Sequence, residues 1–125
     1  MRTRHSLLQT LDQRVLVLDG ATGTGLMARR PDLDPAQGLE GLNVSDPDLV
    51  LSLHAEHLRA GCDLVRTNSF CASEPECAAV GRAGWARRLS RRAAELAREA
   101  AGDEAFVLGV LGPGRGHASD GERVE

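Results

Sequence analysis

Three short apolar runs, each closed by turn-forming residues, constrain the fold of this chain more than any other feature. The runs are Arg14–Leu18, Cys62–Thr67 and Ala105–Leu111. Each is followed by Gly, Asn or Asp, and short apolar segments bounded in this way are typical of strands buried on both faces of a parallel sheet. The sequence therefore predicts three buried parallel β-strands at these positions.

The interval between the first two runs contains a helix pattern. We expect the helix to begin at Ser45, which can cap it with Asp48 three residues on, and to end at Gly61, where a left-handed residue is favoured. His54 and His57 are three residues apart on this helix and could chelate a metal. Because no third ligand is close in the sequence, we interpret them as partly buried helix residues.

A second helix pattern precedes the third run. Its apolar stripe covers residues 85–100 and stops at Gly102. The opposite face pairs Arg91 with Glu95 one turn later, as solvated helix surfaces do. Glutamates interrupt the arginines of this face and no aromatic side chains accompany them, so the pattern indicates a solvated helix and not a nucleic-acid surface.

The order strand, helix, strand, helix, strand is typical of a parallel α/β fold. Right-handed crossovers place the carboxyl ends of all three strands at one edge, where ligands bind in such folds. Those ends are Asp19–Gly20, Thr67–Asn68 and Gly112–Pro113. The stretch 30–44, rich in Pro, Asp and Gly, is predicted to be a loop.

Composition excludes several functions. All fifteen basic residues are arginine, so a lysine Schiff base and a P-loop lysine are excluded. A formal charge of -3 provides no general attraction to nucleic acid or to anionic lipid. No apolar run is long enough for a signal peptide or a membrane span, and the odd cysteine count (Cys62, Cys71 and Cys77) indicates reduced thiols. We expect a cytoplasmic protein with no nucleic-acid or membrane partner.

Four segments at the ends of these elements carry distinctive residue combinations. They are Val17–Thr24, Glu40–Val50, Ala60–Phe70 with its Thr-Asn-Ser-Phe ending, and Phe106–Gly114. In this order they resemble the homocysteine S-methyltransferase family, in particular the homocysteine-binding domain of cobalamin-dependent methionine synthase. The family typically has Thr-Asn-Thr-Phe where this chain has Thr-Asn-Ser-Phe.

The resemblance implies a (β/α)8 TIM barrel, which needs about 250 residues. Residues 1–125 would then be a partial homocysteine-binding domain: an incomplete barrel of the first three strand–helix units, truncated before the strands that carry the zinc ligands. Three strands leave two open edges, which a stable monomer should not tolerate. We therefore expect a non-catalytic fragment, or a half-domain that needs a complementing chain or a homo-oligomer.

The resemblance also implies the chemistry. In the family, zinc held by three cysteines binds the sulfur of homocysteine and keeps it as the nucleophilic thiolate, which accepts a methyl group to give methionine. The family's ligands, a single cysteine and a Cys-Cys pair, are absent from this sequence, so we expect no metal ligands, no catalytic residues and no turnover by this chain alone. The methyl donor stays open, and cobalamin or folate would require further domains.

Four residues are candidates for homocysteine binding. The resemblance implies that Asp19, at a strand end, binds the amino group, although a turn or cap role is equally compatible with its spacing alone. Backbone N–H groups around Gly20 and Thr22 could receive the carboxylate. Asn68 would lie in the same pocket, or would simply stabilise its turn.

Two alternatives concern the glycines and the cysteines. Gly23-x-Gly25-x-x-Ala28 imitates a dinucleotide-binding fingerprint, but no second strand ending in an acidic residue follows at the required distance. Asp19 would also repel a pyrophosphate, so a nucleotide-binding α/β module is the weaker interpretation. Cys71 is expected near the ligand edge, without a metal role.

Overall fold

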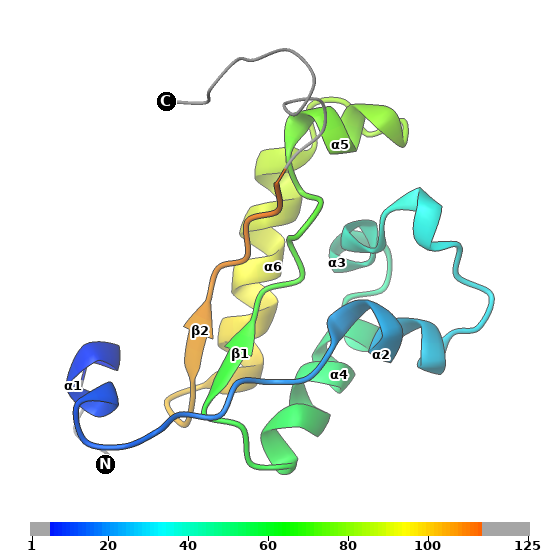
Figure 1. Cartoon of the computed structure of the whole chain (residues 1–125). Coiled ribbons are helices and arrows are strands. Elements are labelled where there is room, and N and C mark those ends of the chain that lie inside the picture. Colours follow the sequence, from blue (N-terminus) through cyan, green and yellow to red (C-terminus); the bar gives the residue numbers. More distant parts are fainter. Residues whose placement is uncertain (1–5, 114–125) are drawn as a thin grey trace.

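The computed structural model describes residues 6–113 (Figure 1). Predictions on residues 1–5 and on Gly114 lie outside this range. The helices and strands, in chain order, are α1 (Leu7–Leu11), α2 (Thr22–Arg29), the 3₁₀ turns η1 (Pro35–Gln37) and η2 (Leu39–Gly41), α3 (Leu42–Ser45), α4 (Pro47–Arg59), β1 (Leu64–Arg66), α5 (Glu74–Ala79), α6 (Ala86–Ala101) and β2 (Phe106–Leu108). None of the helices in the described part of the chain is both long and apolar enough to cross a membrane.

A small parallel sheet organises the molecule. β1 and β2 pair in parallel, with Val65 opposite Val107, and Leu18 forms an isolated parallel bridge to Leu64 on the other side of β1. α6 runs along the two strands, and the segment that leads into α2 crosses beside β1 (Figure 1). The predicted parallel α/β arrangement is confirmed for the second and third runs, with shorter strands than expected.

The first predicted strand, Arg14–Leu18, is wrong as a buried strand. Val15 is 86% exposed and Val17 is 57% exposed. The carboxylate of Asp63 accepts the backbone N–H of Val17 at 2.9 Å and pairs with Arg14 at 2.9 Å. The N–H of Val17 therefore bonds to a side chain, while its carbonyl accepts the backbone N–H groups of Asp63 at 2.8 Å and Leu64 at 3.3 Å. The pairing of this segment with β1 is a single bridge at Leu18.

The start of α4 also differs from the expectation. Asp46 is the N-cap, and its carboxylate accepts the N–H of Leu49 at 3.4 Å, with Pro47 in the first turn as helix starts allow. Ser45 belongs instead to α3, where its hydroxyl donates to the carbonyl of Gly41. The predicted end is confirmed, since Gly61 has a φ of 102°.

The second predicted helix is confirmed as α6. Leu89, Ala93, Leu96 and Ala97 form its buried stripe. Gly102 follows with a φ of 52°, and Arg91 pairs with Glu95 at 3.1 Å on the exposed face. The apolar period of the sequence was therefore sufficient to place this element.

Residues 30–44 are not a simple loop. They contain η1, η2 and most of α3, and the carboxylate of Asp34 caps η1 by accepting the N–H of Ala36 at 2.9 Å. These turns pack on the core, since Leu42 is 6% exposed and lies in a cluster with Leu26, Val50, Leu53 and Leu96. The 3₁₀ turns of this stretch therefore lie next to the carboxyl end of β1.

Small residues let α6 pack closely on the sheet and let α2 pack closely on α4. Val65 of β1 packs on Ala97 and Ala101 of α6, so small residues let the helix approach the sheet closely. α2 approaches α4 in the same way: a Cβ at Gly25 would lie 2.8 Å from Cδ1 of Leu53. This contact sets the position of the first turn of α2 beside the strand ends.

Candidate functional site

A cavity of about 340 Å³ lies at the carboxyl ends of the strands. Its walls come from the start of α2, from the 3₁₀ turns, and from the segments that follow β1 and β2. The lining residues are Ala21–Gly23, Pro35, Gly38–Glu40, Arg66–Cys71 and Val110. This is the edge where the sequence predicts a ligand site.

Hydroxyl groups hold the ends of the two strands together beside this cavity. Thr67 Oγ1 accepts the backbone N–H of Val110 at 3.0 Å and lies 2.7 Å from Ser69 Oγ. Ser69 Oγ then donates to the carbonyl of Val110 at 2.8 Å. Thr67 and Ser69, which follow β1, therefore hold the segment after β2 in place by hydrogen bonds to Val110.

Asp19 lies at this edge but does not line the cavity. Its side chain is 1% exposed. Oδ1 accepts Nε of Arg66 at 2.8 Å, and Oδ2 accepts the backbone N–H of Arg66 at 3.0 Å. The carboxylate is therefore the partner of a guanidinium within the chain, a contact that the sequence analysis did not foresee.

Gly20 and Thr22, the next two candidate residues, follow Asp19 in the chain. The carbonyl of Gly20 accepts Nη2 of Arg66 at 2.8 Å, and a Cβ on Gly20 would lie 3.0 Å from Nε2 of His57. Thr22 opens α2 and lines the cavity, and no side chain caps this helix end. The first turn of α2 thus has no side-chain cap and lies at the cavity wall, and helix N-termini without a cap can bind anions.

Asn68 lines the cavity and is also part of a buried amide network. Its Nδ2 donates to the carbonyl of Leu39 and to Oδ1 of Asn43, both at 3.1 Å. Asn43 returns a hydrogen bond from its own Nδ2 to the carbonyl of Asn68 at 2.8 Å. Because both N–H groups of the Asn68 amide have partners, its carboxamide oxygen is the group that a ligand can use.

Sequence reasoning missed two charged residues of this cavity. Glu40 is 7% exposed, and its Oε1 accepts the backbone N–H of Cys71 at 2.9 Å. Arg66 lines the cavity from β1. Glu40 opens the second segment that carries the family resemblance, and Arg66 interrupts an apolar strand; both features are visible in the sequence but neither reveals a partner.

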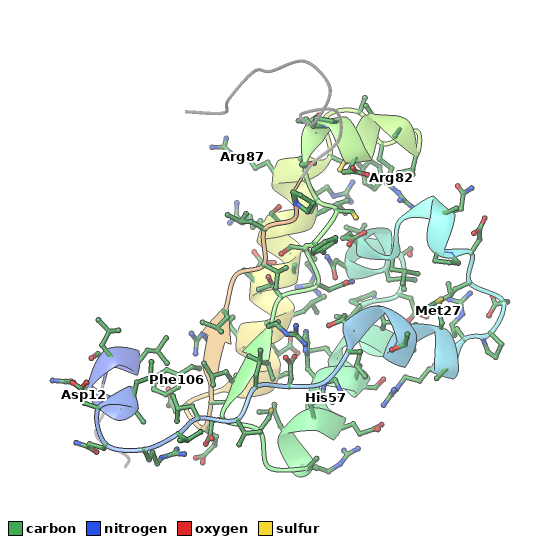
Figure 2. All side chains as sticks on the ribbon, in the orientation of Figure 1. Asp12, Met27, His57, Arg82, Arg87 and Phe106 are labelled. Carbon is green, nitrogen blue, oxygen red and sulfur yellow. The ribbon has the colours of Figure 1, made fainter. Side chains whose placement is uncertain are left out.

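Two histidines of α4 lie behind the strand-end segment. His54 is 1% exposed, and burial lowers its pKa below the ordinary value, an effect that the Asp19 carboxylate opposes. His57 Nδ1 lies 3.9 Å from Oδ2 of Asp19, and Figure 2 shows this side chain between α4 and the segment that leads into α2. His54 is buried and His57 is half-buried, so the interpretation as partly buried helix histidines is confirmed.

The cysteines are distributed over three places. Cys62 packs beside the Val65 cluster, Cys77 is the buried residue of α5, and Cys71 lines the cavity as expected. Burial raises the pKa of the Cys62 and Cys77 thiols, which disfavours the thiolate that zinc binds. Within residues 6–113 no three His, Cys, Asp or Glu side chains gather closely enough to hold a metal ion. These residues therefore do not fit the three-cysteine zinc site that the resemblance implies.

The glycines of α2 have separate roles. Gly23 lines the cavity, whereas Gly25 faces Leu53 in the contact between α2 and α4. A phosphate-binding turn needs its glycines to face one ligand. The described geometry therefore gives the nucleotide-binding alternative no specific support.

Comparison with known proteins assigns the family. The family model described as homocysteine S-methyltransferase matches residues 16–125. Methionine synthase of Mycobacterium leprae is 40% identical, with 86% of this chain covered, and that of Mycobacterium tuberculosis is 38% identical with the same coverage. The chain spans 10% of the length of each of these curated relatives.

Solved structures agree with this assignment. The metallated form of the homocysteine methyltransferase MmuM from Escherichia coli is 30% identical, with a TM-score of 0.71, and the match covers 83% of this chain and 40% of that one. The oxidised form gives the same identity and TM-score over 82% and 39%. The fold is thus an α/β fold similar to part of a homocysteine methyltransferase. The chain belongs to the homocysteine S-methyltransferase family.

Proposed function

We propose that this chain forms the part of a homocysteine S-methyltransferase site that binds the amino-acid end of homocysteine. The observation that carries the proposal is the 340 Å³ cavity at the strand ends, which lies between the first turn of α2 and the Thr-Asn-Ser segment in a chain of this family. A cavity of this size suits a small amino acid.

In the proposed contacts, the ammonium group and the carboxylate group of the ligand have separate partners. Asp19 pairs with Arg66 and does not line the cavity, so we propose that the ammonium group of the ligand displaces that guanidinium and binds the Asp19 carboxylate. The backbone N–H groups around Gly20 and Thr22 provide donors for the carboxylate group. The carboxamide oxygen of Asn68 contributes from the neighbouring strand end. These are binding contacts, and we assign no catalytic residue to this chain.

Methyl transfer needs groups other than those described here. In the reaction, a methyl group passes from a donor to the sulfur of homocysteine and gives methionine. The three cysteines lie apart, so no step at the sulfur is assigned to them. We propose that polypeptide other than these residues supplies the sulfur-activating groups, and that the purified chain does not form methionine by itself.

Isothermal titration calorimetry with L-homocysteine under reducing conditions tests the binding proposal. Ala21 lies at the cavity wall, and Ala21→Trp should fill it and weaken binding by about tenfold or more. Ala28→Trp is the matched control, because Ala28 is exposed on the same helix and does not line the cavity. Absence of homocysteine binding by the unmodified chain, or equal binding by both tryptophan variants, would contradict the proposal.

A further inference from the structure

Cys71 lines the strand-end cavity, whereas Cys62 and Cys77 do not. The backbone N–H of Cys71 donates to Oε1 of Glu40 at 2.9 Å, and the N–H of the next residue, Ala72, donates to the carbonyl of Ser69 at 3.1 Å. These two bonds hold the backbone around Cys71 at the cavity wall. All three cysteines are thiols and form no disulfide with one another.

The same cavity contains a buried acceptor that points to a ligand. Asn68 is 5% exposed and lines the cavity. Its Nδ2 donates to two acceptors of the chain, whereas no hydrogen bond from residues 6–113 reaches its carboxamide oxygen. Because a buried acceptor without a partner is costly, this oxygen favours a ligand with an N–H donor. Phe70 also lines the cavity and is 54% exposed, so the cavity meets solvent beside it.

We infer that Cys71 is a modification site, at which L-homocystine, the disulfide of homocysteine, forms a mixed disulfide that occupies the cavity. This inference rests on the proposed function, because the proposed amino-acid contacts would hold one half of homocystine in the cavity that Cys71 lines. The oxidised form of the substrate would then block the site, and a reducing agent would reopen it.

The reaction is a thiol–disulfide exchange and is separate from methyl transfer. The thiolate of Cys71 attacks one sulfur of homocystine, an S–S bond forms to Cys71 Sγ, and the S–S bond of homocystine breaks. The other half leaves as homocysteine thiolate and takes up the proton that Cys71 released. One disulfide replaces another, so no oxidant is required.

Burial makes the other two cysteines poor competitors for this reaction. Cys77 is 1% exposed, and burial raises the pKa of the Cys62 and Cys77 thiols. A raised pKa lowers the fraction of the thiolate, which is the attacking species. We therefore expect the adduct at Cys71.

The test compares L-homocystine with D-homocystine on the unmodified chain. The two enantiomers have equal intrinsic reactivity toward a thiol, so a large rate difference has to come from a binding site. L-Homocystine should form the adduct about tenfold faster or more, a modest part of the proximity effect that a positioned reactant can give. Tandem mass spectrometry of the tryptic peptide 67–82 locates the adduct, since this peptide contains both Cys71 and Cys77.

Matched variants assign the effect to the cavity. Cys71→Ser should abolish the adduct, and Cys62→Ala should keep it. Ala21→Trp, which fills the cavity, should slow the reaction of L-homocystine to the rate of the D-enantiomer, and the exposed Ala28→Trp should not. Dithiothreitol should remove the adduct and restore the homocysteine binding that the adduct abolishes in calorimetry.

Equal rates for the two enantiomers, or an adduct at Cys62 or Cys77 instead of Cys71, would overturn the inference. Calorimetry with L-homocysteine under reducing conditions then shows whether the proposed function fails with it. Binding of L-homocysteine beside equal labelling rates leaves the proposed function standing, whereas absence of both binding and enantiomer preference contradicts the inference and the proposed function together.

Discussion

Asn43 and Asn68 bind each other through both of their amide groups across 25 residues of sequence. Nδ2 of Asn68 donates to Oδ1 of Asn43, and Nδ2 of Asn43 donates to the backbone carbonyl of Asn68 and to that of Leu89. The side chain of Asn43 is fully buried. One residue thus joins α3, the end of β1 and α6, and it holds the 3₁₀ turns against the cavity.

Asn43→Ala should therefore destabilise the chain. The substitution removes the Asn43 partner of the Asn68 carbonyl and of one Asn68 amide N–H, together with a second bond to the Leu89 carbonyl. Each lost buried hydrogen bond costs about 1 kcal/mol or more. We expect the free energy of unfolding to fall by about 2–3 kcal/mol in urea titrations followed by circular dichroism. Gln9→Ala, at an exposed position in α1, is the control and should change it far less. A neutral Asn43→Ala variant would contradict the network.

Asp19→Ala should also destabilise the fold, independently of any ligand. It removes the acceptor of the Arg66 backbone N–H and of Nε, and charge-assisted hydrogen bonds contribute about 1.5–3 kcal/mol each. Because the Arg66 side chain is partly exposed, we expect a net loss of about 2 kcal/mol in the same assay. Asp12→Ala, at the exposed end of α1, should be nearly neutral; equal effects at the two positions would sink the prediction.

Two glycines of α2 should respond to alanine with opposite signs. A Cβ at Gly23 would lie 3.6 Å from Cδ1 of Leu39, an ordinary contact, whereas one at Gly25 would lie 2.8 Å from Cδ1 of Leu53. Alanine is favoured over glycine in helices by about 1 kcal/mol, so Gly23→Ala should be neutral or stabilising. Gly25→Ala should cost about 1–3 kcal/mol, because Leu53 is buried and cannot move freely. Urea midpoints of the two variants, compared at one pH, decide this, and a shift of the same sign in both contradicts the packing of α2 on α4.

The stability of the chain should fall below neutral pH through His54. Burial lowers the pKa of this imidazole from the ordinary value of 6.5, so the unfolded chain binds the proton more readily than the folded chain. The contribution is therefore fully present above pH 6.5 and is lost as the pH falls through the folded pKa. Urea midpoints measured across this range should show the decline, and His54→Leu should remove that part of it. An identical pH profile in His54→Leu would contradict this origin.

The sequence predicted those features that depend on neighbours along the chain. The apolar period placed α6, and the left-handed residues Gly61 and Gly102 marked two helix ends. The strand-end edge was also predicted, because carboxyl ends of parallel strands meet at one edge, and the cavity does lie beside Thr67 and Asn68. The binding roles of Asp19, Gly20, Thr22 and Asn68 stay predictions.

The features that the sequence did not reveal depend on contacts between distant residues. Nothing local indicates that the Asp63 side chain accepts the N–H of Val17, or that Arg66 pairs with Asp19 across 47 positions. The turns within residues 30–44 were missed because their short helices depend on packing against the core more than on propensity. A pattern can thus place the edge of a sheet without showing which side chains at that edge already have partners.

The most direct test of the account is a ¹H–¹⁵N NMR titration of the chain with L-homocysteine. The backbone amides of Gly20, Ala21 and Thr22, together with those of residues 67–71, should shift with one common saturation curve, while the amides of α5 and the outer face of α6 should not. Saturable shifts at the strand ends would support the proposed amino-acid site. Shifts confined to other elements, or none at all, would contradict it.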